Sequence, residues 1–131
     1  MAKFRELEVW KRAMKYTTRV YEVSAAFPKS EVFGLTGQLR RAAVSIALNI
    51  AEGSGSGSDA EFSRFLQIAL RSSYEVVAAI DIALNLGYLN RRIADELTKE
   101  ADEIAAMLGG LIRYLGKKRR QTPGGSRQTE G

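Results

Sequence analysis

The residue pattern with the clearest chemical meaning is a row of cations near the start of the chain. Lys11, Lys15 and Arg19 recur at four-residue steps, with Arg12 beside them. In a helix this spacing places the cations along one ridge. Such a ridge could follow the phosphates of RNA or DNA. It could equally be the solvated face that every amphipathic helix needs.

A second candidate is the pair Arg40 and Arg41. Adjacent side chains lie about 100° apart around a helix, so at least one arginine must flank the buried face. Phosphate binding is one possible role, and an ion pair to a carboxylate is the other. The candidate carboxylates are Glu31, Glu52, Glu61 and Glu75. We favour the ion pair, because a short Gly-Ser turn brings Glu52 near the base of the next helix.

A third candidate is the run Lys117, Lys118, Arg119 and Arg120, which opens the segment 117–131. This segment carries +4 of the net charge of +5, so the remaining 116 residues carry only +1. It lacks apolar anchors and contains Pro-Gly-Gly, which predicts a disordered basic tail. The tail could bind nucleic acid non-specifically, or it could simply improve solubility and complement the negative end of the preceding helix.

Polar residues around a glycine-rich turn form the fourth candidate. Asn49 and Glu52 lie beside the buried stripe of one helix, and Ser58 with Glu61 has the spacing of a capping box at the start of the next. We expect these four residues to form a structural polar network that fixes the turn. The alternative is a cation site made by Glu52, Glu61 and Glu75.

The composition excludes most catalytic machinery. The 131 residues include no histidine and no cysteine. Thiol and imidazole nucleophiles, zinc sites with these ligands and a ferritin-like di-iron centre are therefore excluded. No cofactor motif is present, so we expect neither an enzyme nor a bound cofactor or metal. The sequence has no signal-peptide pattern and no membrane-length apolar stretch, which predicts a cytoplasmic protein without a membrane partner.

Helical periodicity must position these candidates. We predict helices at about 6–25, 35–52, 59–86 and 91–115, separated by Pro28, the Gly-Ser run 53–58 and a short turn at Gly87. The inner stripe predicted for the first helix contains Val9, Trp10, Ala13, Met14, Thr17, Val20 and Tyr21. No segment has strand periodicity. The chain thus predicts an all-α, up-and-down antiparallel four-helix bundle at 1–116, followed by the tail.

Four ordered motifs carry a family resemblance. They are Phe4-x-x-Leu7-x-Val9-Trp10-Lys11-x-Ala13, Phe27-Pro28-x-x-Glu31-x-Phe33-Gly34-Leu35-Thr36-x-Gln38, Arg40-Arg41-Ala42-Ala43-Val44-Ser45-Ile46 with Asn49-Ile50-Ala51-Glu52-Gly53, and Glu61-Phe62-x-x-Phe65-Leu66-x-Ile68-Ala69. Together they resemble the four-helix-bundle proteins of the 23S rRNA intervening-sequence family. The resemblance implies a ring-like homo-oligomer, usually a pentamer, and no defined activity. Where the family typically has Ser-Ile-Pro-x-Asn, this chain has Ser-Ile-Ala-Leu-Asn at 45–49.

Two functions from different classes fit these features. The first is a non-enzymatic homo-oligomeric scaffold that binds RNA or DNA through its basic surface residues. The second is a protein-interaction adaptor with no nucleic-acid role.

Overall fold

The computed structural model describes residues 3–121, with side chains for residues 3–118. This part of the chain contains four α-helices, two short 3-10 helices and no strand. The α-helices are α1 (Glu8–Ser24), α2 (Leu35–Ser54), α3 (Asp59–Asn85) and α4 (Arg91–Gln121), and the 3-10 helices are η1 (Lys3–Glu6) and η2 (Lys29–Glu31).

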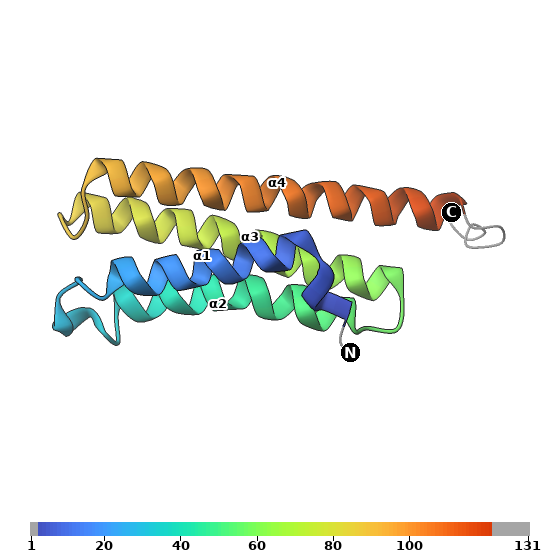
Figure 1. The fold of residues 1–131 in the computed structure, drawn as a ribbon, viewed down its shortest axis with the longest axis horizontal. Coiled ribbons are helices and arrows are strands. Elements are labelled where there is room, and N and C mark those ends of the chain that lie inside the picture. The colour runs from blue at the N-terminus through green and yellow to red at the C-terminus, as the bar shows by residue number, and fades with distance from the viewer. Residues whose placement is uncertain (1–2, 122–131) are drawn as a thin grey trace.

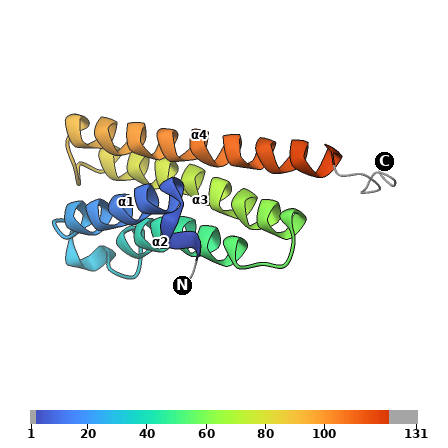
Figure 2. The same ribbon diagram turned by 45° about the vertical axis from the view of Figure 1, so that its right-hand side comes forward.

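Successive helices run antiparallel and lie side by side (Figures 1 and 2). The most extensive packing joins α2 to α3 and α3 to α4, whereas α1 packs on α2 and more sparsely on α4. The predicted all-α, up-and-down four-helix bundle is therefore confirmed. Because α1 is the shortest helix, the last turns of α4 extend beyond its start (Figure 1).

The predicted start and end of α3 are confirmed, with one difference at the start. The hydroxyl of Ser58 accepts a hydrogen bond from the backbone N–H of Glu61 at 3.1 Å, as expected for an N-cap. The Glu61 carboxylate does not complete the capping box, because it accepts two hydrogen bonds from Arg64. Gly87 follows the helix with φ = 80°, a conformation that glycine adopts without strain.

The inner face of α1 differs from the predicted stripe. The sequence pattern places Met14 and Tyr21 inside, but they are 48% and 43% exposed, while Tyr16 and Ser24 are buried. The phenol of Tyr16 donates a hydrogen bond to the backbone oxygen of Leu97 in α4 at 2.9 Å. Burial raises the pKa of Tyr16, with smaller contributions from nearby carboxylates, so the phenol stays protonated and keeps this bond.

The C-terminal boundary also differs from the sequence-based division at residue 116. Because α4 continues to Gln121, Lys117 and Lys118 belong to the helix. The rest of the predicted tail, 122–131, lies outside the described residues. Within residues 3–121, no helix combines the length and the hydropathy needed to cross a membrane.

Candidate functional site

Two cations of the α1 ridge are neutralised by α4. Arg12 forms an ion pair with Glu103, and Arg19 donates a hydrogen bond to Glu96 at 2.8 Å. The bond from Arg19, more than any other contact, holds the pKa of Glu96 below its usual range. Both arginines therefore join α1 to α4 instead of presenting a free charge to a phosphate backbone.

The other two cations of the ridge are more accessible. Lys11 makes a weak ion pair with Glu8 within one turn, at 3.5 Å, and both side chains are mostly exposed. Lys15 is exposed and forms no hydrogen bond or ion pair with any residue that the structure describes. Of the predicted ridge, only these two lysines are available to an anionic ligand.

The predicted ion pair of Arg40 is wrong. Its guanidinium donates hydrogen bonds to the Ser24 hydroxyl at 2.8 Å and to the backbone oxygen of Tyr21 at 3.2 Å. It also stacks on the Tyr21 ring, 4.5 Å from the ring centre. Arg40 thus connects α2 to the C-terminal end of α1, where it adds a hydrogen bond to a carbonyl that also accepts the backbone N–H of Ala25.

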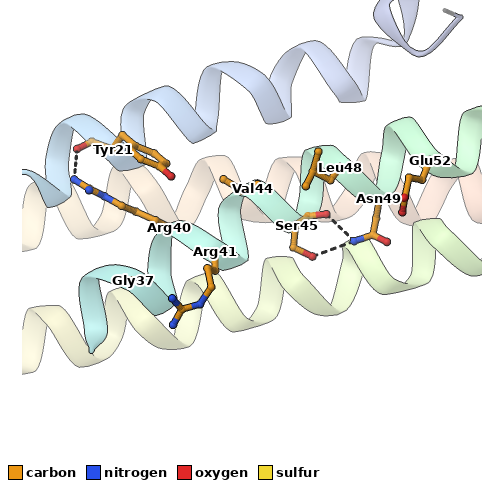
Figure 3. Close-up of a pocket in the computed structure, with 9 residues that line it drawn as sticks. All are labelled: Tyr21, Gly37, Arg40, Arg41, Val44, Ser45, Leu48, Asn49 and Glu52. Atoms are coloured by element: carbon orange, nitrogen blue, oxygen red, sulfur yellow. Dashed lines mark hydrogen bonds between the residues drawn. The ribbon is translucent and has the colours of Figure 1, made fainter. Parts of the chain in front are cut away.

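Arg41 lies on a different side of α2 and forms no ion pair with a described residue either (Figure 3). Its guanidinium folds back along the helix, so that a Cβ atom built on Gly37 would lie 3.0 Å from Nη1. The positive charge of Arg41 therefore remains available on the outer face of α2.

A groove of about 660 Å³ runs along this outer face. It is lined by Tyr21, Gly37, Arg40, Arg41, Val44, Ser45, Leu48, Asn49 and Glu52 (Figure 3). Leu48 is 59% exposed in the groove, and Glu52 is exposed without a hydrogen bond or ion pair among the described residues. The groove thus combines an apolar surface with one free charge of each sign.

The predicted network of Asn49, Glu52, Ser58 and Glu61 does not form as one unit. Asn49 donates to the backbone oxygen of Ser45 at 2.8 Å and to its hydroxyl at 3.0 Å. Ser58 and Glu61 interact only at the start of α3, and Glu52 joins neither group. The sequence pattern failed here because Asn49 lies toward α3, whereas Glu52, nearly a turn later, points outward.

The alternative cation site at the same turn is not assembled either. Within the part of the chain that the structure describes, no three acidic side chains are close enough to hold a metal ion. Glu61 is instead bound to Arg64. The structure therefore offers no geometry for the carboxylate cluster of Glu52, Glu61 and Glu75.

The end of α4 carries the remaining basic candidates. Lys117 is exposed, and Lys118 lies 3.4 Å from Asp59 at the start of α3. One turn earlier in α4, Arg113 and Tyr114 are also exposed, and sequence reasoning missed both. Their four-residue spacing from Lys117 and Lys118 was the signal for one continuous helical surface. The side chains of Arg119 and Arg120 lie outside the described residues.

Glu31, a predicted partner of the arginines, has a structural role instead. Its carboxylate accepts the backbone N–H of Leu35 at 2.9 Å and the phenol of Tyr88 at 2.8 Å. The first of these bonds, helped by the second, lowers the pKa of Glu31. Glu31 therefore connects the start of α2 to the turn between α3 and α4.

The lowered pKa of Glu31 predicts a pH-dependent contribution to stability. A carboxylate with a lowered pKa stabilises the fold fully above its ordinary pKa, and this contribution disappears as the pH falls through the lowered value. We expect Glu31→Gln to lose less stability than wild type on acidification, measured by urea unfolding between about pH 7 and pH 3. Glu22→Gln, at an exposed position without a hydrogen-bond partner among the described residues, is the control and should retain the wild-type slope. Identical slopes for all three proteins would contradict the assigned role of Glu31.

Comparison with known proteins agrees with this architecture. The family model for the 23S rRNA-intervening sequence protein matches residues 5–110. A solved structure from Bacteroides thetaiotaomicron, described as a protein of unknown function from the S23 ribosomal protein family, superposes with a TM-score of 0.74 at 23% sequence identity. The match covers 80% of this chain and 95% of that one. No curated protein matches the sequence. The matched family model covers most of the chain, which therefore belongs to the 23S rRNA-intervening sequence protein family.

Proposed function

We propose that the protein is a non-enzymatic, homo-oligomeric scaffold that binds RNA or DNA. The observation that carries the assembly part is Phe33, whose side chain is 94% exposed although it lies between two ordered helical segments. A large apolar side chain in this position costs free energy in water and gains it when a partner covers it. We propose a closed ring, for which the family resemblance implies five copies.

Other large side chains support assembly. Those at least 40% exposed, besides Phe33, are Met14, Tyr21, Val32, Leu48, Tyr74, Ile82, Leu86 and Tyr114. Several of them share a helix face, so they can form continuous contact surfaces. The sequence contains neither histidine nor cysteine, which supports a binding role over a catalytic one.

The exposed end of α4 is the best candidate surface for nucleic acid. Arg113 and Lys117 lie one turn apart on one face, beside Tyr114, which is 58% exposed. Cations near an exposed aromatic ring suit a phosphate backbone with stackable bases. A ring repeats this surface in every copy, and each neutralised phosphate adds about 0.9 to the slope of log affinity against log salt on duplex DNA.

A protein-interaction adaptor is the second candidate, and the ion pairs of Arg12 and Arg19 favour it. These pairs remove half of the α1 ridge from the set of free cations. If the remaining cations serve only solubility, the exposed apolar side chains would contact a protein partner instead of more copies of this chain.

The test combines nucleic-acid binding with mass measurement. Fluorescent RNA and DNA are titrated with the full-length protein over a salt series, and light scattering gives the mass in the same buffers. We expect the double variant Arg113→Glu with Lys117→Glu to bind more weakly and with a shallower salt slope. The matched control is Arg91→Glu with Arg92→Glu, which makes the same charge change at the other end of α4 and should bind like wild type.

Two results would contradict the proposal. A wild-type protein that is monomeric at micromolar concentration would exclude the scaffold. Absence of wild-type binding would leave the adaptor. Wild-type binding that both double variants weaken equally would exclude the end of α4 as the specific nucleic-acid surface.

A further inference from the structure

Two rows of residues lie on the outer faces of α2 and α3, and most of them are exposed among the described residues, while Gly37, Val44 and Ile68 are partly buried. The first row begins just before α2 and contains Phe33, Gly37, Arg41, Val44, Leu48 and Glu52. The second contains Arg64, Ile68, Arg71, Glu75, Ala78 and Ile82 of α3. Both rows advance in steps of three and four residues, the spacing by which one helix packs against another. The groove described above is part of the first row.

The contacts inside one bundle define which residues of α2 and α3 lie at the same height. The hydroxyls of Ser45 and Ser72 are 2.9 Å apart. Toward the start of α3, Phe62 and Phe65 lie beside Gly53 of α2. Since the helices are antiparallel, residues of α2 and α3 lie at the same height when their numbers add up to about 116.

At this register the charged residues of the two rows are complementary. Arg41 lies at the height of Glu75, and Glu52 lies at the height of Arg64. Arg41, Glu52 and Glu75 form no hydrogen bond or ion pair with any described residue. Arg64 bonds to Glu61 in its own helix, but its side chain is still 57% exposed. These four residues thus form two pairs of opposite charge at matching heights, whereas Arg71 lies level with Val44 and has no charged counterpart in the first row.

The apolar residues of the two rows also match. Leu48 lies at the height of Ile68. Phe33, just before the start of α2, belongs to the same end of the bundle as Ile82 near the end of α3, which is 50% exposed. Between these layers, Gly37 lies at the height of Ala78, and two small residues allow helices to approach closely. The two rows therefore match in their apolar, small and charged positions except at one height, where Arg71 of the second row lies level with the apolar Val44.

We infer that the first row of one copy docks against the second row of the next copy, with Arg41 facing Glu75 and Glu52 facing Arg64 across the interface. This inference rests on the proposed homo-oligomer and identifies its contact surfaces. A rotation about an axis parallel to the bundle leaves the height of every residue unchanged, so α2 of one copy meets α3 of the next at the register found within one chain. Such an interface uses different faces on its two sides, the kind that closes into rings.

Docking of α3 from a second copy covers both rows, whereas another arrangement of two copies covers only one. The docked α3 would fill the groove on α2 and cover Leu48 and Phe33 together. The alternative is an antiparallel pairing of α2 with α2 of another copy. Because Arg41 and Glu52 lie toward opposite ends of the groove, this pairing could bring Arg41 of one copy near Glu52 of the other. That arrangement would leave the second row on α3 uncovered, including Glu75 and Ile82.

Charge reversal tests the interface with the full-length protein. We expect Arg41→Glu and Glu75→Arg each to place like charges across the contact and to reduce the mass in light scattering toward that of one chain, 14.4 kDa. When the two variants are mixed, the introduced glutamate of one faces the introduced arginine of the other, and a tagged variant should retain the untagged one in a mixed oligomer. Lys15→Glu and Asp102→Arg make the same charge changes on other faces and should keep the wild-type mass.

The outcomes separate this interface from the proposed function. A monomeric wild type would reject the scaffold itself. If the wild type is oligomeric and neither charge reversal changes its mass, only the interface is overturned. The interface is also overturned if Arg41→Glu dissociates the oligomer but Glu75→Arg neither has the same effect nor restores a mixed oligomer. Far-ultraviolet circular dichroism and thermal unfolding confirm that each variant is folded before its mass is interpreted.

Discussion

Replacing Ile46 by alanine is expected to lower the free energy of unfolding by about 2–5 kcal/mol. Ile46 is fully buried at the centre of the inner face of α2. The substitution removes apolar contacts and leaves a cavity that the surrounding helices fill only in part. Urea unfolding, followed by circular dichroism at a fixed protein concentration, measures the change.

Met14→Ala is the control for this loss. Sequence periodicity places Met14 on the inner stripe of α1, whereas the structure leaves its side chain 48% exposed. We therefore expect Met14→Ala to change the free energy of unfolding by less than about 0.5 kcal/mol, as is usual for surface positions. Equal losses for the two variants would mean that α1 lies with its sequence-predicted face inward.

The ends of α3 are predicted from the sequence more accurately than the buried face of α1, for a physical reason. Helix ends are fixed by local chemistry, such as the Ser58 cap and the left-handed Gly87. On α1, one possible inner face contains Met14 and Tyr21, and another contains Tyr16 and Ser24. The second face is buried because Tyr16 reaches a carbonyl of α4, a contact between residues far apart in the chain.

The candidate site depends even more on contacts between helices. Arg12 and Arg19 are seven residues apart, as are their partners Glu96 and Glu103 in α4. The matching intervals were present in the sequence, but they identify partners only when α1 and α4 are known to be antiparallel neighbours at one register. The partners of Arg40 had no comparable signal, because one is a backbone oxygen at the end of α1.

Gly53→Ala is the second substitution with a large expected effect. A Cβ atom at this buried position would lie 2.8 Å from the Cβ of Phe65, 2.9 Å from Cδ1 of Phe62 and 3.2 Å from the Phe62 backbone oxygen. Alanine normally stabilises a helix relative to glycine by about 0.5–1 kcal/mol. Here the overlap with α3 dominates, and we expect a net loss of about 1–3 kcal/mol in the free energy of unfolding, measured by urea denaturation.

Gly55→Ala provides the comparison for Gly53→Ala, since the nearest atoms to its new Cβ would be 3.8 Å away. It should retain wild-type stability. Adding Phe62→Ala to Gly53→Ala should not restore stability, because the contact with the Cβ of Phe65 remains and every residue other than glycine carries that atom. A Gly53→Ala protein at least as stable as Gly55→Ala would show that α3 can move away from the end of α2 at little cost. The register shared by α2 and α3 would then be weakly defined at this end of the bundle, and the pairing of Glu52 with Arg64 across copies would lose its basis.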